Sequence, residues 1–329
     1  MQESDELLAI RAAELYYEED KTQDEIGQLL MLTRWKVGRL LAQAKDRGYI
    51  RIEIVHPRAR RPVLERRLRD ELGLEDAVVV SAAGVSRPEE VQTRTAQAAA
   101  DYLASLRPAP RVLGVSWGRT ISEVAADLRP GWASGVSVVQ LNGGVSFNRF
   151  AGTAAAAASM IAQKGGGSAT LLPSPAILEH VETKRAIETD RVVAGVLDLA
   201  ANADVSLFSA GSADHGSVHI DSGYLTAGDL DALVAGGAVG DVVGRYLDAE
   251  GRIVDTSLDE RTIGVTLDRL RSAPRTIAVI AGRAKHPVAA AVVRSGICRI
   301  LVTDEETALH LLDGSASADP SATTGRTPE

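Results

Sequence analysis

The stretch from residue 22 to residue 54 reads TQDEIGQLLMLTRWKVGRLLAQAKDRGYIRIEI, and it decides the fold of the first part of the chain. Thr22 can cap a helix that ends near Met31 and Leu32, because Glu25 follows three residues later in the capping-box arrangement. Thr33 can cap a second helix, whose apolar residues share one face: Val37, Leu40, Leu41 and Ala44. Two short helices joined by a tight turn, the second basic near its start, are typical of a helix-turn-helix that enters the major groove of DNA.

The flanking residues extend this motif. An amphipathic helix is predicted from Ser4 to Tyr17, with an apolar face formed by Leu7, Leu8, Ala12 and Leu15. After Gly48, the isoleucines at positions 50, 52 and 54 alternate with Arg51 and Glu53, which is the pattern of a strand. We therefore expect a winged helix-turn-helix domain over residues 1–56, all-α apart from a short wing.

The charge of the chain is unevenly distributed. The formal net charge is −8 in total, but it is −6 over residues 1–20, +8 over residues 21–69 and −10 over residues 70–329. A basic segment in an acidic chain is the electrostatic footprint of a phosphate contact, although it can also be a solvated, arginine-rich helix face. DNA binding is favoured because Trp35 lies off the apolar stripe. The expected contacts are Thr33, Arg34, Trp35, Lys36 and Arg39, without a basis for separating base contacts from phosphate contacts.

Length and composition limit the remaining possibilities. The 329 residues are enough for two domains, and 45% hydrophobic residues indicate a globular protein. Cys298 is the single cysteine, so an internal disulfide is excluded. No basic and apolar signal region follows Met1, and no run of about 18 apolar residues occurs. We expect a cytoplasmic protein without a membrane span.

The second part of the chain alternates short β-branched runs with alanine-rich helical stretches. Residues 57–75 are rich in arginine and repeat leucine every four residues, which predicts a linker helix. Strands are then predicted at 78–80, 111–115, 136–141, 169–172, 205–208, 276–280 and 299–302. This alternation indicates an α/β fold, a doubly wound, Rossmann-like parallel sheet over residues 76–313. The tail over residues 314–329 is poor in apolar residues and is expected to be disordered.

The loops that follow strands are where ligands bind in such sheets. The stretch GVSWGRT leaves a strand and enters a helix at residues 114–120. Backbone N–H groups at the helix N-terminus can bind a phosphate there, with Ser116, Arg119 and Thr120 as additional donors. The alternative is a tight turn without a ligand. The stretch matches neither the dinucleotide fingerprint nor the P-loop, so neither a dinucleotide nor a nucleoside triphosphate is indicated.

Three other loops carry polar residues near the ends of apolar runs. Asn142 precedes Gly143 and Gly144 and can both donate to and accept from a sugar hydroxyl. Asp241 follows Gly240 and can accept from hydroxyls, and Lys285 follows the run that ends at Ile280. Each signal alone is weak, but together they predict one site at the carboxyl edge of the sheet.

Other constellations are not supported. His215 and His219 could be drawn as a metal cluster with nearby aspartates, but a loop of glycine, serine and aspartate is more often solvated. No G-x-S-x-G elbow supports a Ser-His-Asp triad. We therefore predict no metal, no cofactor and no catalytic residue.

The motifs in this order and spacing resemble the SorC family of bacterial sugar-responsive transcriptional regulators, over residues 5 to 313. They are the third helix and wing quoted above, GVSWGRT, VVQLNGG, LLPSP, GAVGD and AGRAKH leading to LVTDEETALHLL. The resemblance implies a winged helix-turn-helix followed by an effector domain similar to sugar-phosphate isomerases, assembled as homodimers or homotetramers on palindromic operator DNA.

The resemblance also implies residue roles. The effector-binding positions would be Gly114, Ser116, Trp117, Gly118, Arg119, Thr120, Asn142, Gly143, Gly144, Asp241 and Lys285. The family's phosphate loop falls on residues 116–120, its sugar contact on Asn142, its acidic contact on Asp241 and its phosphate-facing lysine on Lys285. Some relatives carry a basic residue where Asn142 stands. Asn142 cannot pair with a second phosphate or form an imine, which argues against a bisphosphate or Schiff-base effector. Arg283 replaces a glycine of many relatives and would narrow the pocket.

Three functions follow from these observations. The leading one is a transcription factor whose operator affinity is controlled by a phosphorylated sugar or sugar alcohol. The second is a sugar-phosphate isomerase with an appended DNA-binding module, in which Asp241 would move the proton. The third is a DNA-binding protein whose second domain only oligomerises and binds no ligand.

Overall fold

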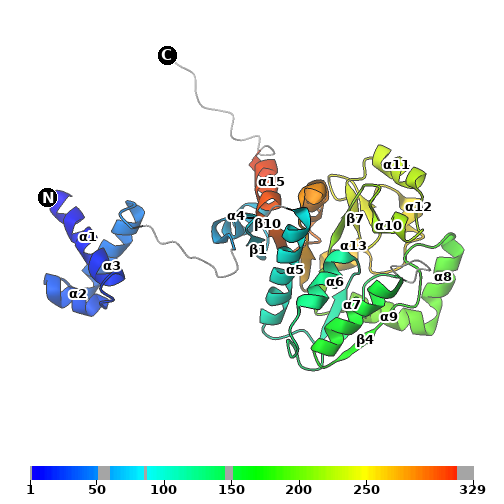
Figure 1. The fold of residues 1–329 in the computed structure, drawn as a ribbon, viewed down its shortest axis with the longest axis horizontal. Helices are drawn as coiled ribbons and strands as arrows, with labels where there is room; N and C mark the ends of the chain where they lie inside the picture. The colour runs from blue at the N-terminus through cyan, green and yellow to red at the C-terminus, as the bar shows by residue number, and fades with distance from the viewer. Residues whose placement is uncertain (1, 51–59, 85–86, 145–150, 317–329) are drawn as a thin grey trace, which may run out of the picture. The chain divides into compact units, whose positions relative to one another are not determined.

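The computed structural model describes residues 2–50, 60–84, 87–144 and 151–316. The chain divides into two compact units, Met1–Val55 and His56–Glu329, and each is described by itself (Figure 1). The predicted wing over residues 50–54 lies outside the described residues from Arg51 onward, as does the tail from residue 317.

The first unit is a bundle of three helices, α1 (Gln2–Tyr17), α2 (Gln23–Leu30) and α3 (Arg34–Asp46). The predicted capping box is present, because the Thr22 hydroxyl accepts from the Glu25 N–H and the Glu25 carboxylate accepts from Thr22. Thr33 caps α3 as predicted and accepts from the Lys36 N–H. The buried residues of α3 are the four of the predicted stripe: Val37, Leu40, Leu41 and Ala44.

The face that α1 buries agrees with the prediction except at Leu7. Ala12 and Leu15 are buried and Leu8 packs against the same core, together with Ala9 and Ala13, whereas Leu7 is exposed. The small side chains of Ala9, Ala12 and Ala13 allow α1 and α3 to pack closely, and Leu7 lies outside this contact. Leu7 was therefore a wrong core assignment.

The predicted linker helix is α4 (Pro62–Leu72), and it packs within the second unit. Leu68 is fully buried, and the Glu65 carboxylate accepts from the backbone N–H of Val79 at 3.0 Å. The backbone of Arg60 also forms an isolated bridge with Val80. These contacts make α4 a cover over the edge of the sheet, so describing it as a linker was wrong.

The second unit contains a seven-stranded parallel sheet in the order β1-β10-β9-β5-β2-β3-β4. Its strands are β1 (Asp76–Val80), β2 (Val112–Val115), β3 (Ser137–Gln140), β4 (Ser168–Thr170), β5 (Val205–Phe208), β9 (Thr276–Val279) and β10 (Ile300–Asp304). All seven were predicted, because buried parallel strands appear as continuous apolar runs. The α/β fold is thus confirmed.

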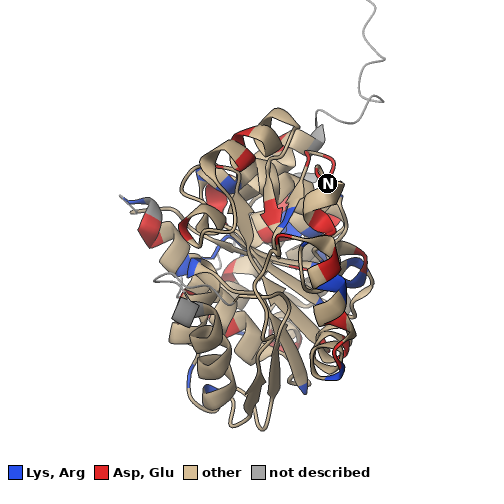
Figure 2. Ribbon diagram, turned by 90° about the vertical axis from the view of Figure 1, so that its right-hand side faces the viewer, with Lys and Arg blue, Asp and Glu red and all other residues tan. Residues whose placement is uncertain are grey.

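Helices cover both faces of this sheet (Figure 1). One face packs against α5 (Pro88–Ser105), α6 (Arg119–Asp127) and α7 (Ala151–Lys164). The other packs against α4, α9 (Arg191–Ala201), α13 (Leu267–Ser272), α14 (His286–Arg294) and α15 (Glu305–Ala316). Neighbouring strand residues such as Val78 and Val79 belong to opposite cores, as the pleat requires. Figure 2 shows the charged residues mainly on helices and loops around the strands.

A second, antiparallel sheet was not predicted. It consists of β6 (Ala210–Ser212), β7 (Gly240–Val242) and β8 (Arg245–Leu247), in that order. Around it lie α8 (Val181–Thr189), α10 (Val218–Asp221), α11 (Ala227–Ala235) and α12 (Thr256–Asp259). Asp241 therefore belongs to a strand of this small sheet and not to the edge of the main one.

The end of the described chain also differs from the prediction. Helix α15 continues to Ala316, so residues 314–316, which were predicted to belong to a disordered tail, are helical. Within the described ranges, every helix is too short or too polar to span a lipid bilayer.

Candidate functional site

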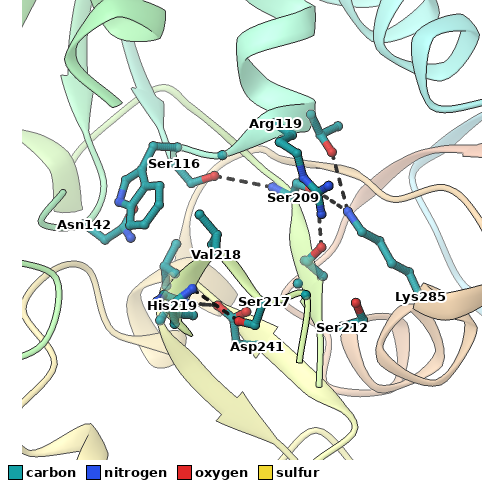
Figure 3. A pocket seen from close by; sticks show the side chains of 18 of the residues that line it. Ser116, Arg119, Asn142, Ser209, Ser212, Ser217, Val218, His219, Asp241 and Lys285 are labelled. Carbon is teal, nitrogen blue, oxygen red and sulfur yellow. Dashed lines mark hydrogen bonds and ion pairs between the residues drawn. The ribbon is translucent and has the colours of Figure 1, made fainter. Parts of the chain in front are cut away.

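A pocket lies at the carboxyl ends of β2, β3 and β5, between the main sheet and the small one (Figure 3). It is lined by residues from several segments that lie far apart in the sequence, from Gln92 to Lys285, so the chain must fold before the site exists. Of the predicted effector positions, those that line it are Ser116, Trp117, Gly118, Arg119, Thr120, Asn142, Asp241 and Lys285.

One end of the pocket is cationic. Gly118 precedes α6 with φ of 129°, a conformation that L side chains rarely adopt. This turn places the N-terminus of α6, with Arg119 and Thr120 in its first turn, at the pocket. Its first backbone N–H groups have no partner within the helix, which favours an anion in this position.

Lys285 reaches the same end from the short helix η1 (Arg283–Lys285). Its Nζ lies 3.5 Å from Thr120 Oγ1 and 3.4 Å from Ser209 Oγ. Burial, together with the nearby Arg119 charge, lowers the pKa of Lys285 to about 8, although Asp241 and Glu123 oppose the shift. Among the described residues, no carboxylate forms an ion pair with Lys285 or Arg119. Two cations that face each other without an anion create a site for one.

The other end of the pocket contains a buried carboxylate. Asp241 Oδ2 accepts from His219 Nε2 at 3.1 Å and from the Gly244 N–H at 3.0 Å. Burial alone would raise the pKa of Asp241, but the interaction with His219 and the Gly244 hydrogen bond bring it below its ordinary value. Asp241 is therefore an ionised acceptor.

Gly211 makes room for this carboxylate. It pairs with Asp241 across the β6–β7 ladder, and a Cβ at position 211 would lie 2.2 Å from Asp241 Oδ1. Only glycine is compatible with this side-chain position.

Asn142 follows β3 and is 3% exposed. Its backbone bridges to Gly264, whose missing side chain lets the two segments approach closely. The segment that contains Gly264 is held by the buried Arg245 guanidinium, which donates to the carbonyls of Gly264 and Val265 and pairs with Asp259 at 2.6 Å. Arg245 lies on β8, which pairs with β7, the strand of Asp241. It therefore links this strand to the Gly264 segment that packs against Asn142.

Trp117 connects the two ends of the pocket. Its indole Nε1 donates to the Gly143 carbonyl at 2.7 Å, and its ring meets His219 edge-on with centroids 5.9 Å apart. A Cβ at Gly144 would lie 3.1 Å from the indole ring, so this glycine makes room for the tryptophan.

Three predicted positions do not line the pocket. Gly114 lies in β2 against Leu141, and Gly143 packs against the carbonyl of Pro175. With Gly144, these glycines shape the walls of the site from behind. Their close approach to neighbouring chain segments explains their identity better than contact with a ligand does.

Sequence analysis missed eleven residues that line the pocket, among them the polar side chains of Ser209 and His219. The expectation that His219 is solvated was wrong, because it is 2% exposed and bonded to Asp241. Its burial depends on the small antiparallel sheet, which no apolar run revealed. His215, in contrast, is exposed and pairs with Asp231 at 2.8 Å. The described residues contain no group of three side chains that could hold a metal ion.

The predicted DNA contacts lie at the start of α3. Arg34, Trp35 and Arg39 are exposed, and Trp35 is 86% exposed despite its size. Arg34 Nη1 lies 3.5 Å from Asp24 on the preceding helix, and Thr33 forms the N-cap. Lys36 is partly buried.

Comparison with known proteins gives one family and several relatives. The family model described as "Putative sugar-binding domain" matches residues 59–313. The "Deoxyribonucleoside regulator" of Bacillus subtilis is 31% identical over 311 residues, which cover 93% of this chain and 97% of that protein. The "Erythritol catabolism regulatory protein EryD" of Brucella abortus is 29% identical over 316 residues, with 95% and 98% covered. The full-length sorbitol operon regulator SorC from Klebsiella pneumoniae matches with a TM-score of 0.70 at 27% identity, and the match covers 93% of this chain and 98% of that one.

Proposed function

The chain belongs to the SorC family of sugar-binding transcriptional regulators, and we propose that its effector is a phosphorylated sugar or sugar alcohol held in the pocket of the second unit. The names of its relatives refer to the regulation of nucleoside, erythritol and sorbitol genes. The open question is therefore the chemistry of the effector and the residues that bind it.

The observation that carries the proposal is the cationic end of the pocket. Lys285 and Arg119 meet the N-terminus of α6 there, and neither has a carboxylate partner among the described residues. A phosphate would accept hydrogen bonds from the ammonium, the guanidinium and the helix N–H groups. The polar opposite end, with Asp241 and Asn142, suits the hydroxyl groups of a sugar.

In this geometry, Asp241 is poorly suited to move the proton that the isomerase alternative requires. A general base works best when its pKa lies near the operating pH. The pKa of Asp241 is lowered below the ordinary carboxylate value, so Asp241 is a weak base. The polar lining of the pocket also favours a ligand-binding domain over one that only oligomerises.

DNA binding is assigned to α3 of the first unit. Thr33 caps this helix, and its first two turns contain Arg34, Trp35, Lys36 and Arg39. The buried residues of the helix, from Val37 to Ala44, lie on another face. We propose that this surface enters the major groove, as the second helix of a helix-turn-helix does.

Regulation then requires that the effector bind two quaternary states of a homodimer or homotetramer with different affinities. A ligand with equal affinity for both states would shift nothing. Coupling free energies of about 1–3 kcal/mol are typical and correspond to changes of about 5- to 150-fold in DNA affinity.

Thermal unfolding of the intact chain with inorganic phosphate and a series of sugar and polyol phosphates tests this function. A ligand at 100 times its dissociation constant stabilises the protein by about 2.7 kcal/mol. We expect stabilisation in the unmodified chain, loss of stabilisation in Arg119→Ala, and retention in Arg129→Ala, which removes an exposed arginine away from the pocket. If every phosphorylated compound leaves the transition unchanged, the proposed effector class is wrong.

A further inference from the structure

Lys285 can act as a nucleophile as well as a cation. Its side chain lines the pocket at the end that also contains Arg119 and the N-terminus of α6 (Figure 3). We propose that carbon dioxide adds to Nζ of Lys285 in the effector-free pocket, and that the resulting carbamate occupies the place of the effector phosphate. Formation of the carbamate is independent of the effector, whereas its effect on phosphate binding rests on the proposed function.

The addition needs a neutral amine. Burial and the Arg119 charge lower the pKa of Lys285 to about 8, so about half of this amine is neutral at pH 8, compared with roughly 0.4% of an ordinary lysine. The carboxylates of Asp241, Glu123 and Asp214 oppose the shift, but within the described ranges none of them forms an ion pair with this amine. Lys285 therefore has the free electron pair that the addition requires.

The reaction is an addition followed by the loss of a proton. The ammonium first releases a proton to solvent, and the free electron pair of Nζ then forms a bond to the carbon of carbon dioxide. One C=O π pair moves onto its oxygen, which becomes a carboxylate oxygen, and the nitrogen releases a second proton. Each carbamate thus converts the Lys285 cation into an anion, and nothing is oxidised or reduced.

The surroundings of Nζ supply partners to this anion. Arg119 repels the ammonium, whereas a carbamate at the same place pairs with its guanidinium. The N–H groups in the first turn of α6 also favour an anion. Nζ lies 3.5 Å from Thr120 Oγ1 and 3.4 Å from Ser209 Oγ. A hydroxyl that accepts from the ammonium can rotate and donate to a carbamate oxygen, so the same two side chains serve both forms.

Lys184 provides the contrast within the same chain. It is also partly buried, but its Nζ pairs with Glu188 at 3.5 Å, and this carboxylate stabilises the ammonium and would repel a carbamate. The pocket beside Lys285 has a cavity of about 80 Å³, several times the space that one water molecule needs, so the three heavy atoms of carbon dioxide fit there. Space and a neighbouring cation therefore distinguish Lys285 from Lys184.

The carbamate makes the pocket sensitive to carbon dioxide. It fills the anion site with a covalently attached negative charge, and the like charge of a phosphate is repelled from the same place. The addition is reversible, so a phosphorylated effector and carbon dioxide compete for Lys285. The response to the effector is therefore weaker when carbon dioxide is abundant.

The test uses the intact chain in two buffers of about pH 8 and equal ionic strength, one containing carbon dioxide and bicarbonate and one free of both. The triethyloxonium ion ethylates a carbamate and so preserves it for peptide mass spectrometry. We expect a trapped carbamate at Lys285 and none at Lys184. Inorganic phosphate should suppress the trapping, and its own dissociation constant should be at least threefold higher in the buffer that contains carbon dioxide.

Three variants separate the carbamate from a bicarbonate ion that merely occupies the anion site. Lys285→Arg keeps a cation but has no amine that can be neutral, so its phosphate affinity should be equal in the two buffers. Bicarbonate acting as a simple anion would weaken phosphate binding in this variant as well. Arg119→Ala should yield severalfold less trapped carbamate, because it removes the partner of the anion. Lys184→Arg is the control and should behave like the unmodified chain.

The outcomes separate this inference from the proposed function. The inference is overturned if no carbamate is trapped at Lys285, if Lys184 is trapped equally, or if Lys285→Arg loses as much phosphate affinity to carbon dioxide as the unmodified chain. A carbamate at Lys285 that leaves phosphate affinity unchanged overturns the competition. A carbamate at Lys285 in a chain that binds neither inorganic phosphate nor any phosphorylated compound supports the modification and overturns the proposed function.

Discussion

Lys285 determines how effector binding should depend on pH. Burial and the Arg119 charge lower its pKa to about 8, below the ordinary lysine value, so the free protein loses this proton as the pH rises through 8. Phosphate binding needs the ammonium, and above pH 8 it must therefore take up a proton. We predict that the dissociation constant, corrected for the second ionisation of inorganic phosphate, stays nearly constant from pH 7 to about 8 and then rises by up to about tenfold per pH unit.

The matched variant is Lys285→Arg, which keeps its charge across this range. It should bind phosphate without the alkaline loss. Calorimetry in buffers of different ionisation enthalpy gives the proton uptake directly. Affinity that is constant to pH 9.5 in the unmodified chain would remove Lys285 from the phosphate contacts.

Gly211 tests the position of Asp241. A methyl group at residue 211 would meet Asp241 Oδ1 at 2.2 Å, so Gly211→Ala must displace the carboxylate. We predict at least a tenfold loss of affinity for the preferred polyol phosphate and a change of less than threefold for inorganic phosphate. Gly195→Ala is the control, because a Cβ in that helix meets nothing within 4 Å. Equal titration curves for Gly211→Ala and the unmodified chain would contradict the described Asp241 geometry.

Trp35 is predicted to read thymine. The methyl group of thymine is the apolar feature of the major groove, and the exposed Trp35 ring stands between Arg34 and Lys36. In a duplex that the protein selects from a random pool, replacing thymine by deoxyuridine removes only that methyl. We expect severalfold weaker binding at one or two thymines, and no such effect in Trp35→Ala. Leu7→Ala, at an exposed residue of α1, should keep the discrimination. Equal discrimination in Trp35→Ala would exclude this contact.

At the scale of elements, features that depend on neighbouring residues could be predicted from the sequence, whereas features that depend on distant parts of the chain could not. The capping box at Thr22 and the cap at Thr33 depend on residues three positions apart, and the strands of the main sheet are continuous apolar runs. The small sheet has three-residue strands that contain Gly240, Asp241 and Arg245, and such strands have no apolar signature. Its absence from the prediction explains why Asp241 was misplaced and why the burial of His219 was missed.

The start of helix α15 links the loop that carries Lys285, at the cationic end of the pocket, with Arg61, near the start of the second unit. Asp304 Oδ2, at its start, accepts from the Gly282 N–H at 2.8 Å and so holds the loop of Lys285. The adjacent Glu305 pairs with Arg61 Nε at 3.0 Å, immediately before α4. A shift of the Lys285 loop on effector binding would therefore be transmitted through Asp304 and Glu305 to Arg61, near the start of the second unit.

We predict that Glu305→Gln weakens the regulatory coupling. DNA affinity and effector affinity measured separately should each change by less than threefold, whereas the ratio of DNA affinities with and without effector should fall severalfold. Glu306→Gln, which alters the exposed neighbouring carboxylate, should leave this ratio unchanged. An undiminished ratio in Glu305→Gln would show that coupling does not pass through this ion pair.

At the scale of the whole molecule, positive charge is concentrated in one stretch of the chain. Residues 21–69 have a net charge of +8, but both units are net acidic, with −3 over residues 1–55 and −5 over residues 56–329. The acidic second unit is repelled by DNA, so the affinity for DNA must come from a few cations of the first unit, and phosphate binding in the second unit depends on a local pocket. The functions of the units are therefore separable by single substitutions.

The predicted outcome for Arg39→Ala follows from this separation. In a salt titration of duplex binding, each phosphate contact contributes about 0.9 to the slope of log affinity against log salt concentration. If Arg39 contacts a phosphate, the variant should bind selected and scrambled duplexes equally more weakly, with a slope reduced by about 0.9. If it contacts a base, the loss should be confined to the selected duplex.

Arg269→Ala, in the acidic second unit, should leave DNA binding unchanged. Arg39→Ala should also keep its phosphate-induced thermal shift, because the pocket lies wholly in the second unit. Unaltered DNA affinity of Arg39→Ala at every salt concentration would exclude this face of α3 as the DNA surface.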